Sequence, residues 1–91
     1  MRIEMKEKLD HIFKTFGFEK QIEKLREEVE ELYQELFTYD NEEKLIDEMA
    51  DVYIILSQFF QNSPLMKSAV EYKLDRTVER IESGYYKEAR E

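Results

Sequence analysis

The sequence predicts an all-α protein, and three observations support this fold class. Hydrophobic residues recur at helical spacing in four segments of the chain. The chain has two glycines and one proline, and 40% of its residues are charged, a composition typical of long helices joined by short turns. Recognisable helix-end signals separate the four segments. A length of 91 residues suits one domain with a modest core, so we expect a single domain over residues 1–91.

The first two helices are expected on either side of a glycine. Residues 4–15 carry apolar side chains at helical spacing, and Gly17 is placed to end this helix in the left-handed cap conformation. The second helix is expected over residues 19–37. Its apolar residues follow one another at alternating steps of four and three, the spacing of a core-facing seam. This seam consists of Phe18, Ile22, Leu25, Val29, Leu32 and Leu36.

The third helix is expected over residues 41–61. Asp40 and Glu43 are three residues apart and predict a capping box at its start. Because only about four residues join this helix to the second one, the two helices are expected to pack as an antiparallel hairpin with their seams facing each other. The seam of the third helix consists of Leu45, Met49, Val52, Leu56 and Phe59.

The fourth helix is expected over residues 64–82. Ser63 is a suitable N-cap, and Pro64 suits the first helical position. Ser83-Gly84 ends the helix, and residues 85–91 are expected to form a frayed helical extension. Together the segments predict a four-helix bundle around the central antiparallel hairpin. The seam of the fourth helix consists of Val70, Leu74, Val78 and Ile81.

The third helix is hydrophobic around most of its circumference. Eleven of the sixteen residues from Leu45 to Phe60 are apolar, and they extend beyond a single stripe. One short chain can scarcely cover them, so we expect homo-oligomerisation, as a dimer or tetramer, to complete the bundle. Active sites shared between subunits would then be natural. The residues that need cover are Ile46, Ala50, Tyr53, Ile54 and Phe60.

The charge of the chain excludes several classes of partner. The net charge is −8, from 22 acidic and 14 basic residues, and this excess repels a nucleic-acid backbone or an anionic membrane surface. No apolar run approaches the roughly 18 residues of a membrane span. The absence of cysteine fits a reducing cytosol. We therefore expect a cytoplasmic protein with neither nucleic acid nor membrane as its partner.

Two pairs of acidic residues mark the second and third helices in the same way. Glu28 and Glu31 are three residues apart, as are Glu48 and Asp51. At about 100° per residue, each pair lies about 60° and 120° to the same side of its seam. Equal-handed flanks of two antiparallel helices lie on the same side of their interface. All four carboxylates are therefore expected at one edge of the hairpin.

Four clustered carboxylates repel one another unless protons or cations are bound. Ligand sets made only of oxygen favour magnesium or manganese over zinc, and magnesium keeps open water positions that phosphates can take. Glu27, next to Glu28, adds an acid that could orient a water. The alternative is that the acidic pairs are solvated helix flanks that aid solubility and pair with lysines.

The acidic residues also carry a family resemblance. Residues 21–32 contain Glu27, Glu28 and Glu31, and sixteen residues then separate Glu31 from Glu48 and Asp51. This pattern resembles the E-E-x-x-E and E-x-x-D signature of MazG-like nucleotide pyrophosphohydrolases. The resemblance implies that Glu28, Glu31, Glu48 and Asp51 bind magnesium, with Glu27 and Glu28 as the catalytic residues and Glu27 near the attacking water. It also implies cleavage between the α and β phosphates of a nucleoside triphosphate, which releases a monophosphate and pyrophosphate.

The fourth helix carries a basic ridge, defined as Lys73, Arg76 and Arg80, which lies beside its apolar seam. The resemblance suggests that this ridge binds the phosphates of the substrate. Several branches of the family have an asparagine where this chain has Thr77, so base contacts remain open. The alternative is that the basic side chains pair with Asp75, Glu79 or another helix.

Other candidate residues have weaker support. His11 stands beside Asp10 on a short helix, where a surface or half-buried position is more common than catalysis. Phe16 or Phe18 could stack on a base, although aromatic residues at helix ends mostly pack in the core. The other aromatic residues considered for this role are Phe13, Tyr33, Phe37 and Tyr39.

The sequence thus predicts a magnesium-dependent hydrolase of nucleoside triphosphates that clears surplus or non-standard nucleotides. A related hydrolase of deoxyuridine nucleotides or of phosphoribosyl-ATP is a second possibility, because those branches share the metal motif. The third is a non-enzymatic helical interaction module whose acidic flanks are solvated. This module predicts that magnesium affects neither stability nor activity.

Overall fold

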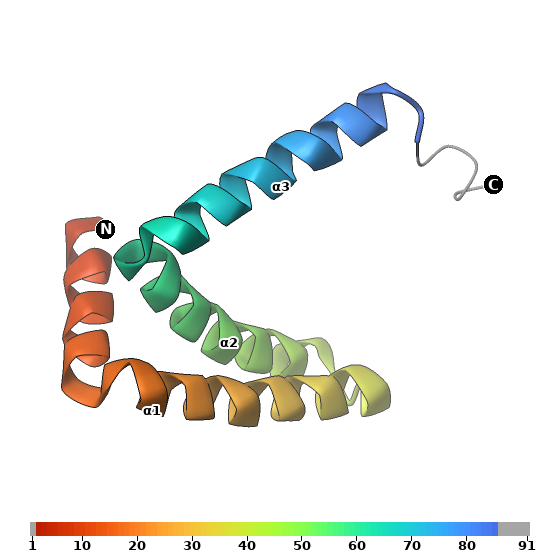
Figure 1. The fold of residues 1–91 in the computed structure, drawn as a ribbon. Helices are drawn as coiled ribbons and strands as arrows, with labels where there is room; N and C mark the ends of the chain where they lie inside the picture. The colour runs from red at the N-terminus through yellow and green to blue at the C-terminus, as the bar shows by residue number, and fades with distance from the viewer. Residues whose placement is uncertain (1, 86–91) are drawn as a thin grey trace.

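The computed structural model describes residues 2–85, with side chains from Glu4 onward. Its helices are α1 (Arg2–Thr38), α2 (Glu42–Asn62) and α3 (Pro64–Glu82), and the described residues contain no strand (Figure 1). The all-α prediction is confirmed. Of the expected tail extension, Tyr85 lies in a turn and residues 86–91 fall outside the described part. Among the described helices, none combines the length and hydropathy needed to cross a membrane.

The first two expected helices form α1, which bends sharply at Gly17 (Figure 1). The backbone of Gly17 has φ 87° and ψ 167°. The positive φ agrees with the prediction, but the left-handed cap was wrong, because the extended ψ places Gly17 in a region that is essentially restricted to glycine. A Cβ at this position would meet no atom within 4 Å. Backbone conformation, and not lack of space, therefore requires the glycine at this elbow.

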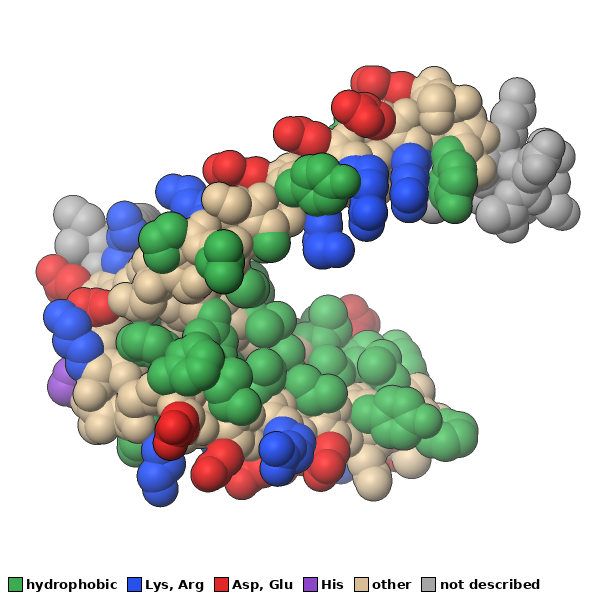
Figure 2. Space-filling model, viewed as in Figure 1, with side chains coloured by type: hydrophobic (Ala, Val, Ile, Leu, Met, Phe, Trp, Pro, Cys, Tyr) green, Lys and Arg blue, Asp and Glu red, His purple; other side chains and the backbone are tan. Residues whose placement is uncertain are grey.

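Helix α3 leaves the hairpin at an angle, as Figure 1 shows. Ser63 alone separates it from α2, and the Ser63 Oγ accepts a hydrogen bond of 3.2 Å from the Met66 backbone N–H. Pro64 begins the helix, as predicted. In α3, all of whose residues are described, no side chain is buried. The described part of one chain therefore does not close into a four-helix bundle, and the space-filling view shows α3 standing clear of the hairpin (Figure 2).

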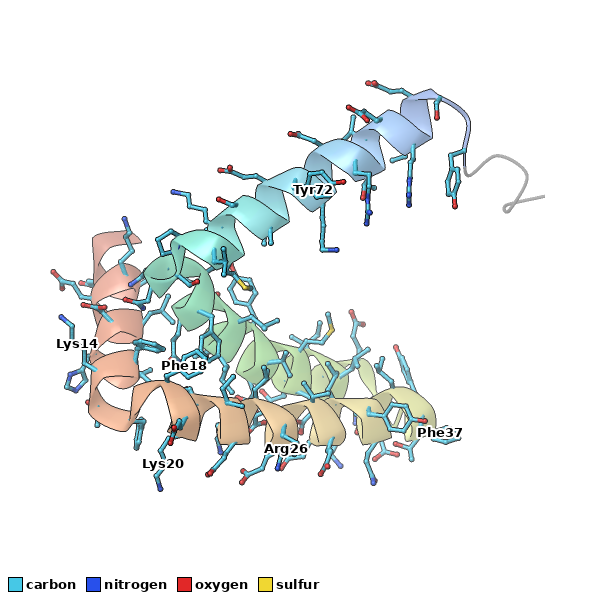
Figure 3. The ribbon with its side chains drawn as sticks, in the orientation of Figure 1. Lys14, Phe18, Lys20, Arg26, Phe37 and Tyr72 are labelled. Atoms are coloured by element: carbon cyan, nitrogen blue, oxygen red, sulfur yellow. The ribbon has the colours of Figure 1, made fainter. Side chains whose placement is uncertain are left out.

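The core lies where the two halves of α1 meet α2. Leu9, Val52, Ile55 and Phe59 are the buried hydrophobic residues of the described chain. Phe59 makes edge-to-face contacts with two rings of α1, Phe13 at 5.8 Å and Phe18 at 5.4 Å between centroids. Figure 3 shows Phe18 on the inner side of the elbow. These aromatic contacts hold the bend of α1 against the C-terminal half of α2.

The contact face of the hairpin differs from the predicted seams. After Gly17, the buried residues of α1 are Gln21, Glu28 and Glu35, and on α2 they include Gln58 as well as Val52 and Phe59. On α1 these positions lie about 40–80° from the predicted seam centre, towards the acidic flank. On α2, Val52 and Phe59 belong to the predicted seam, but Gln58 lies about 140° from its centre, on the acidic side. The helices are rotated because the elbow and Phe59 anchor their packing. The predicted seam residues left exposed are Phe18, Ile22, Val29, Leu36, Met49 and Leu56.

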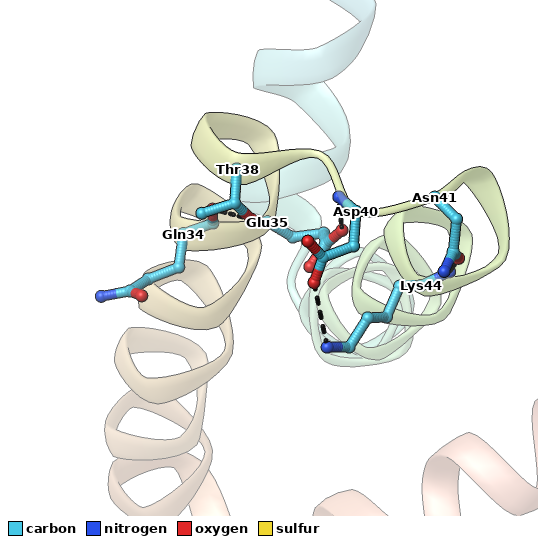
Figure 4. A network of polar contacts seen from close by, with 6 residues as sticks. All are labelled: Gln34, Glu35, Thr38, Asp40, Asn41 and Lys44. Carbon is cyan, nitrogen blue, oxygen red and sulfur yellow. Dashed lines mark hydrogen bonds and ion pairs between the residues drawn. The ribbon is translucent and has the colours of Figure 1, made fainter.

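The start of α2 corrects the predicted capping box. The N-cap is Asn41, one residue later than predicted, and its Oδ1 accepts a hydrogen bond of 2.8 Å from the Lys44 backbone N–H. The Asp40 N–H donates instead to the Glu35 Oε2 at 3.0 Å, which ties Asp40 to the end of α1 (Figure 4). The Asp40 carboxylate accepts from the Lys44 Nζ at 3.4 Å. Because the contact with Glu35 holds Asp40 outside the helix, α2 begins at Glu42.

Candidate metal centre

Three carboxylates meet across the hairpin. Glu28 of α1 and Glu48 and Asp51 of α2 each offer one oxygen, and these three oxygens all lie within 4.8 Å of one another. We call these three residues the acid cluster. The antiparallel packing produces it, because residues 28, 48 and 51 lie on the flanks that the rotated helices turn towards each other. The structure thus brings together three of the four acids predicted as metal ligands.

The other predicted acids lie at the edges of the acid cluster. Glu31 is exposed, and its negative charge is among the causes that raise the pKa of Glu48. Glu27 is also exposed and pairs with the Lys24 Nζ at 3.8 Å. Glu31 therefore suits a role at the rim of the acid cluster, while Glu27 faces the solvent beside it.

Burial and mutual repulsion make the acid cluster electrostatically strained. Glu28 is 6% exposed, and its Oε1 and the Oε1 of Glu48 are buried without a hydrogen-bond partner among the described residues. Burial is the largest cause of the raised pKa of Glu48, and the negative charges of Glu31, Asp51 and Glu28 raise it further. Burial, followed by the charge of Glu28, likewise raises the pKa of Asp51. A bound cation would relieve both effects, since it would satisfy the oxygens and offset their charge.

Lys24 provides a cation of the chain itself at this site. Its Nζ lies 3.1 Å from the Glu28 Oε2. The hydrogen bond to Glu28 is the largest cause of the raised pKa of Lys24, and the negative charge of Glu28 is the second. One ammonium cannot balance three carboxylates, and the Glu28 Oε1 has no hydrogen-bond partner within residues 2–85. The donor set consists of oxygen alone, which fits magnesium or manganese. Lys24 was not among the predicted site residues, although its spacing of four from Glu28 favours an ion pair on a helix.

A pocket of about 470 Å³ adjoins the acid cluster. Glu28 and Asp51 line one part of it, and the apolar wall includes Phe16 of the elbow. Gln58 also lines the pocket, is fully buried, and has no hydrogen-bond partner for either amide atom among the described residues. Sequence reasoning missed Gln58. The sequence feature that could have identified Gln58 is its position seven residues after Asp51, because this spacing places both residues on one face of α2. The remaining lining residues are Ile12, Lys20, Gln21, Glu23, Lys24, Glu27, Ile54 and Ile55.

The basic ridge lies apart from the acid cluster within one chain. Arg76 stacks on the ring of Tyr72 at 5.6 Å, and Arg80 lies 4.7 Å from the ring centroid of Tyr85. No residue of the ridge lines the pocket or forms an ion pair with a described carboxylate. Figure 2 shows basic side chains along the edge of α3 that faces the hairpin and acidic ones along its outer edge. His11 is exposed and does not line the pocket.

Comparisons of the chain with protein-family models, curated proteins and solved structures found no match. The case for a function therefore rests on the residues and geometry of the acid cluster and its pocket.

Proposed function

We propose that this protein is a magnesium-dependent nucleotide pyrophosphohydrolase, which cleaves the bond between the α and β phosphates of nucleoside or deoxynucleoside triphosphates. The observation that carries the proposal is the convergence of the Glu28, Glu48 and Asp51 oxygens within 4.8 Å, beside a pocket. Glu28 and Glu48 each also have a buried oxygen with no hydrogen-bond partner in the described part of the chain. The resemblance of residues 27–31 and 48–51 to the MazG-like signature supplies the reaction.

The residues have distinct proposed roles at the metal. Glu28, Glu48 and Asp51 would hold magnesium, or manganese in its place, and Glu31 would complete the site from the rim. When bound, the metal would neutralise the triphosphate and make its phosphorus more electrophilic. Glu27 would orient the attacking water and accept its proton, a role supported by its exposed position in the lining of the pocket.

Lys24 and the pocket support a nucleotide as the substrate. The Lys24 ammonium lines the pocket beside the acid cluster, within reach of a bound phosphate. Phe16 offers an aromatic surface on the apolar wall. The Gln58 amide has one acceptor and two donor hydrogens, which could pair with a base that presents an adjacent donor and acceptor. Side chains around the fully buried amide would have to move for this contact to form.

The basic ridge is proposed to bind phosphates across a subunit boundary. Lys73, Arg76 and Arg80 lie on α3, which stands clear of the acid cluster of its own chain (Figure 2). In a dimer or tetramer, the basic ridge of one subunit would bind the phosphates of a substrate held at the acid cluster of another subunit. The resulting enzyme would serve nucleotide-pool housekeeping in the cytoplasm.

The test is pyrophosphate release from a panel of nucleotides, with and without magnesium. We expect magnesium-dependent release that Glu48→Gln and Asp51→Asn each reduce about 100-fold or more, an order of effect known for loss of one charge-stabilising group. Glu30→Gln, an exposed acid on the other side of α1, is the matched control and should retain activity. Including deoxyuridine triphosphate and phosphoribosyl-ATP in the panel distinguishes the related branches. Absence of release from every compound would leave the interaction-module interpretation.

A further inference from the structure

Lys24 and Glu28 form an ion pair in which the fold holds only one partner firmly. The Lys24 Nζ lies 3.1 Å from the Glu28 Oε2 and 3.8 Å from the Oε1 of Glu27. The side chain of Glu28 is 8% exposed, whereas that of Lys24 is 53% exposed. Packing of α1 on α2 therefore fixes the Glu28 carboxylate, while the ammonium lies at the edge of the site on a flexible aliphatic stem. Lys24 can leave this contact without a change of fold.

The Lys24 ammonium and a divalent cation at the acid cluster would repel each other. Glu28 contributes one of the three oxygens that lie within 4.8 Å of one another, and its Oε1 is buried with no hydrogen-bond partner among the described residues. If Oε1 held the cation while Oε2 kept the ammonium, two positive charges would share one carboxylate. Their repulsion is strong at so short a distance, because burial lowers the effective dielectric constant. Lys24 therefore opposes metal binding unless another anion attracts its ammonium.

The pocket beside the acid cluster is where such an anion would bind. Lys24 lines this pocket of about 470 Å³, and Lys20 lines it one turn earlier on α1. Lys20 forms no ion pair with a carboxylate in the described part of the chain. A phosphate in the pocket would accept a charge-assisted hydrogen bond from the Lys24 ammonium. The same phosphate would add negative charge next to the metal, so it would remove the opposition between the two cations.

We propose that Lys24 couples the binding of the metal to the binding of the nucleotide. Without a nucleotide, Lys24 balances part of the charge of the acid cluster and weakens its affinity for magnesium. With a nucleotide, the ammonium turns from Glu28 to a phosphate, so each ligand strengthens the binding of the other. Such a coupling is reciprocal, because two linked ligands change each other's affinity by the same factor. The inference rests on the proposed nucleotide hydrolysis and describes how that site is regulated.

Titration calorimetry of Lys24→Gln tests the coupling, because the neutral amide removes the ammonium. The variant should bind magnesium alone about tenfold more tightly than the wild type, and the magnesium complex of an α,β-methylene nucleoside triphosphate about tenfold more weakly. The methylene bridge prevents cleavage, so both titrations measure binding and not activity. Lys20→Gln is the matched control, since it removes the same charge from the same wall of the pocket. This control should leave the affinity for magnesium alone nearly unchanged.

The opposite signs of the two changes distinguish the coupling from simpler roles of Lys24. A purely structural ion pair would weaken both affinities when it is lost. A competitor alone would leave the affinity for the nucleotide analogue unchanged, and a phosphate ligand alone would leave the affinity for magnesium unchanged. Each of these three results would overturn the coupling and leave the proposed hydrolysis intact. Absence of magnesium binding to the wild type, even with the analogue present, would overturn the metal centre as well.

NMR spectroscopy of the wild type decides the case in which Lys24→Gln does not fold. Lysines labelled at the ε-carbon report on the contacts of their ammonium groups, and Lys24→Arg, which keeps the charge, assigns the Lys24 signal. Magnesium alone should shift the Lys24 signal, and the analogue should shift it further. The Lys20 signal should respond mainly to the analogue. A Lys24 signal that neither addition shifts would contradict the proposal.

Discussion

The Lys24 Nζ lies 3.1 Å from the Glu28 Oε2, so an ammonium group rests directly against the most buried carboxylate of the acid cluster. This contact gives the metal-free protein a partial counter-charge where three carboxylates converge. The Lys24 ammonium and a divalent cation would therefore compete for the Glu28 carboxylate. A bound cation would displace the ammonium or turn it towards a bound phosphate.

The first prediction concerns this ion pair. Lys24→Gln should lower the melting midpoint of the metal-free protein by several degrees, because it leaves the buried Glu28 carboxylate without its counter-charge. Saturating magnesium should reduce the difference from the wild type. Lys14→Gln is the control, since it removes only the surface pair of Lys14 with Asp10 at 3.0 Å and should change little. Thermal melting by circular dichroism measures both, and equal midpoints for the two variants would contradict the role of Lys24.

The second prediction is the pH dependence of metal-free stability. Burial and neighbouring acids raise the pKa of Glu48 above 4.5 and that of Asp51 above 3.8. Between those ordinary values and the raised ones, the folded state binds more protons than the unfolded state, so these residues make stability fall as pH increases. Above the raised values their destabilising effect is constant.

Glu48→Gln should therefore flatten this part of the pH profile and raise stability at neutral pH. Urea unfolding of the wild type and the variant in a chelator, from acidic to neutral pH, measures the difference. Parallel profiles would mean that Glu48 titrates normally in the folded protein.

The third prediction ranks the acids by their effect on magnesium. Binding to the folded state alone should raise stability by about 2.7 kcal/mol when magnesium is at 100 times its dissociation constant. Glu28→Gln and Asp51→Asn should abolish this effect at millimolar magnesium. Glu31→Gln, at the rim, should weaken magnesium binding only about tenfold, as expected for a supporting residue. Titration calorimetry of the three variants tests the order, and a loss at Glu31 equal to that at Glu28 would reverse the assignment.

The fourth prediction distinguishes two possible roles of Gln58, one in the stability of the fold and one in substrate binding. Because its buried amide has no partner among the described residues, Gln58→Leu should leave the free energy of unfolding unchanged or raise it by about 1–2 kcal/mol. The same variant should raise KM for nucleotides and leave cleavage of inorganic tripolyphosphate unaffected.

Gln61→Leu provides the contrast to this variant. The Gln61 amide donates to the Lys6 carbonyl at 2.9 Å, so its loss should destabilise the protein. Urea unfolding and steady-state kinetics distinguish the two. Destabilisation by Gln58→Leu, with unchanged kinetics, would assign Gln58 to the core alone.

Local features of the chain were predicted well where a few neighbouring residues decide them. Ser63 and Pro64 begin α3 as expected, and Gly17 interrupts α1 with a positive φ. The start of α2 was wrong by one residue, because the Glu35 carboxylate from the preceding helix binds the Asp40 N–H and leaves Asn41 as the cap. A capping pattern read from sequence does not include such a competing acceptor.

The sequence by itself determined that Glu28 and Glu31, like Glu48 and Asp51, lie to the same side of the predicted seam of their helix, because helical periodicity fixes the angle between residues on one helix. Only the tertiary structure decided which sector faces the neighbouring helix. Eleven of the sixteen residues from Leu45 to Phe60 are apolar, so several orientations bury a hydrophobic stripe and periodicity cannot choose among them. Packing of Phe13 and Phe18 on Phe59 fixes the rotation that encloses Glu28 and exposes Met49 and Leu56. Contacts between residues distant in sequence thus set both the acid cluster and the apolar residues that stay exposed.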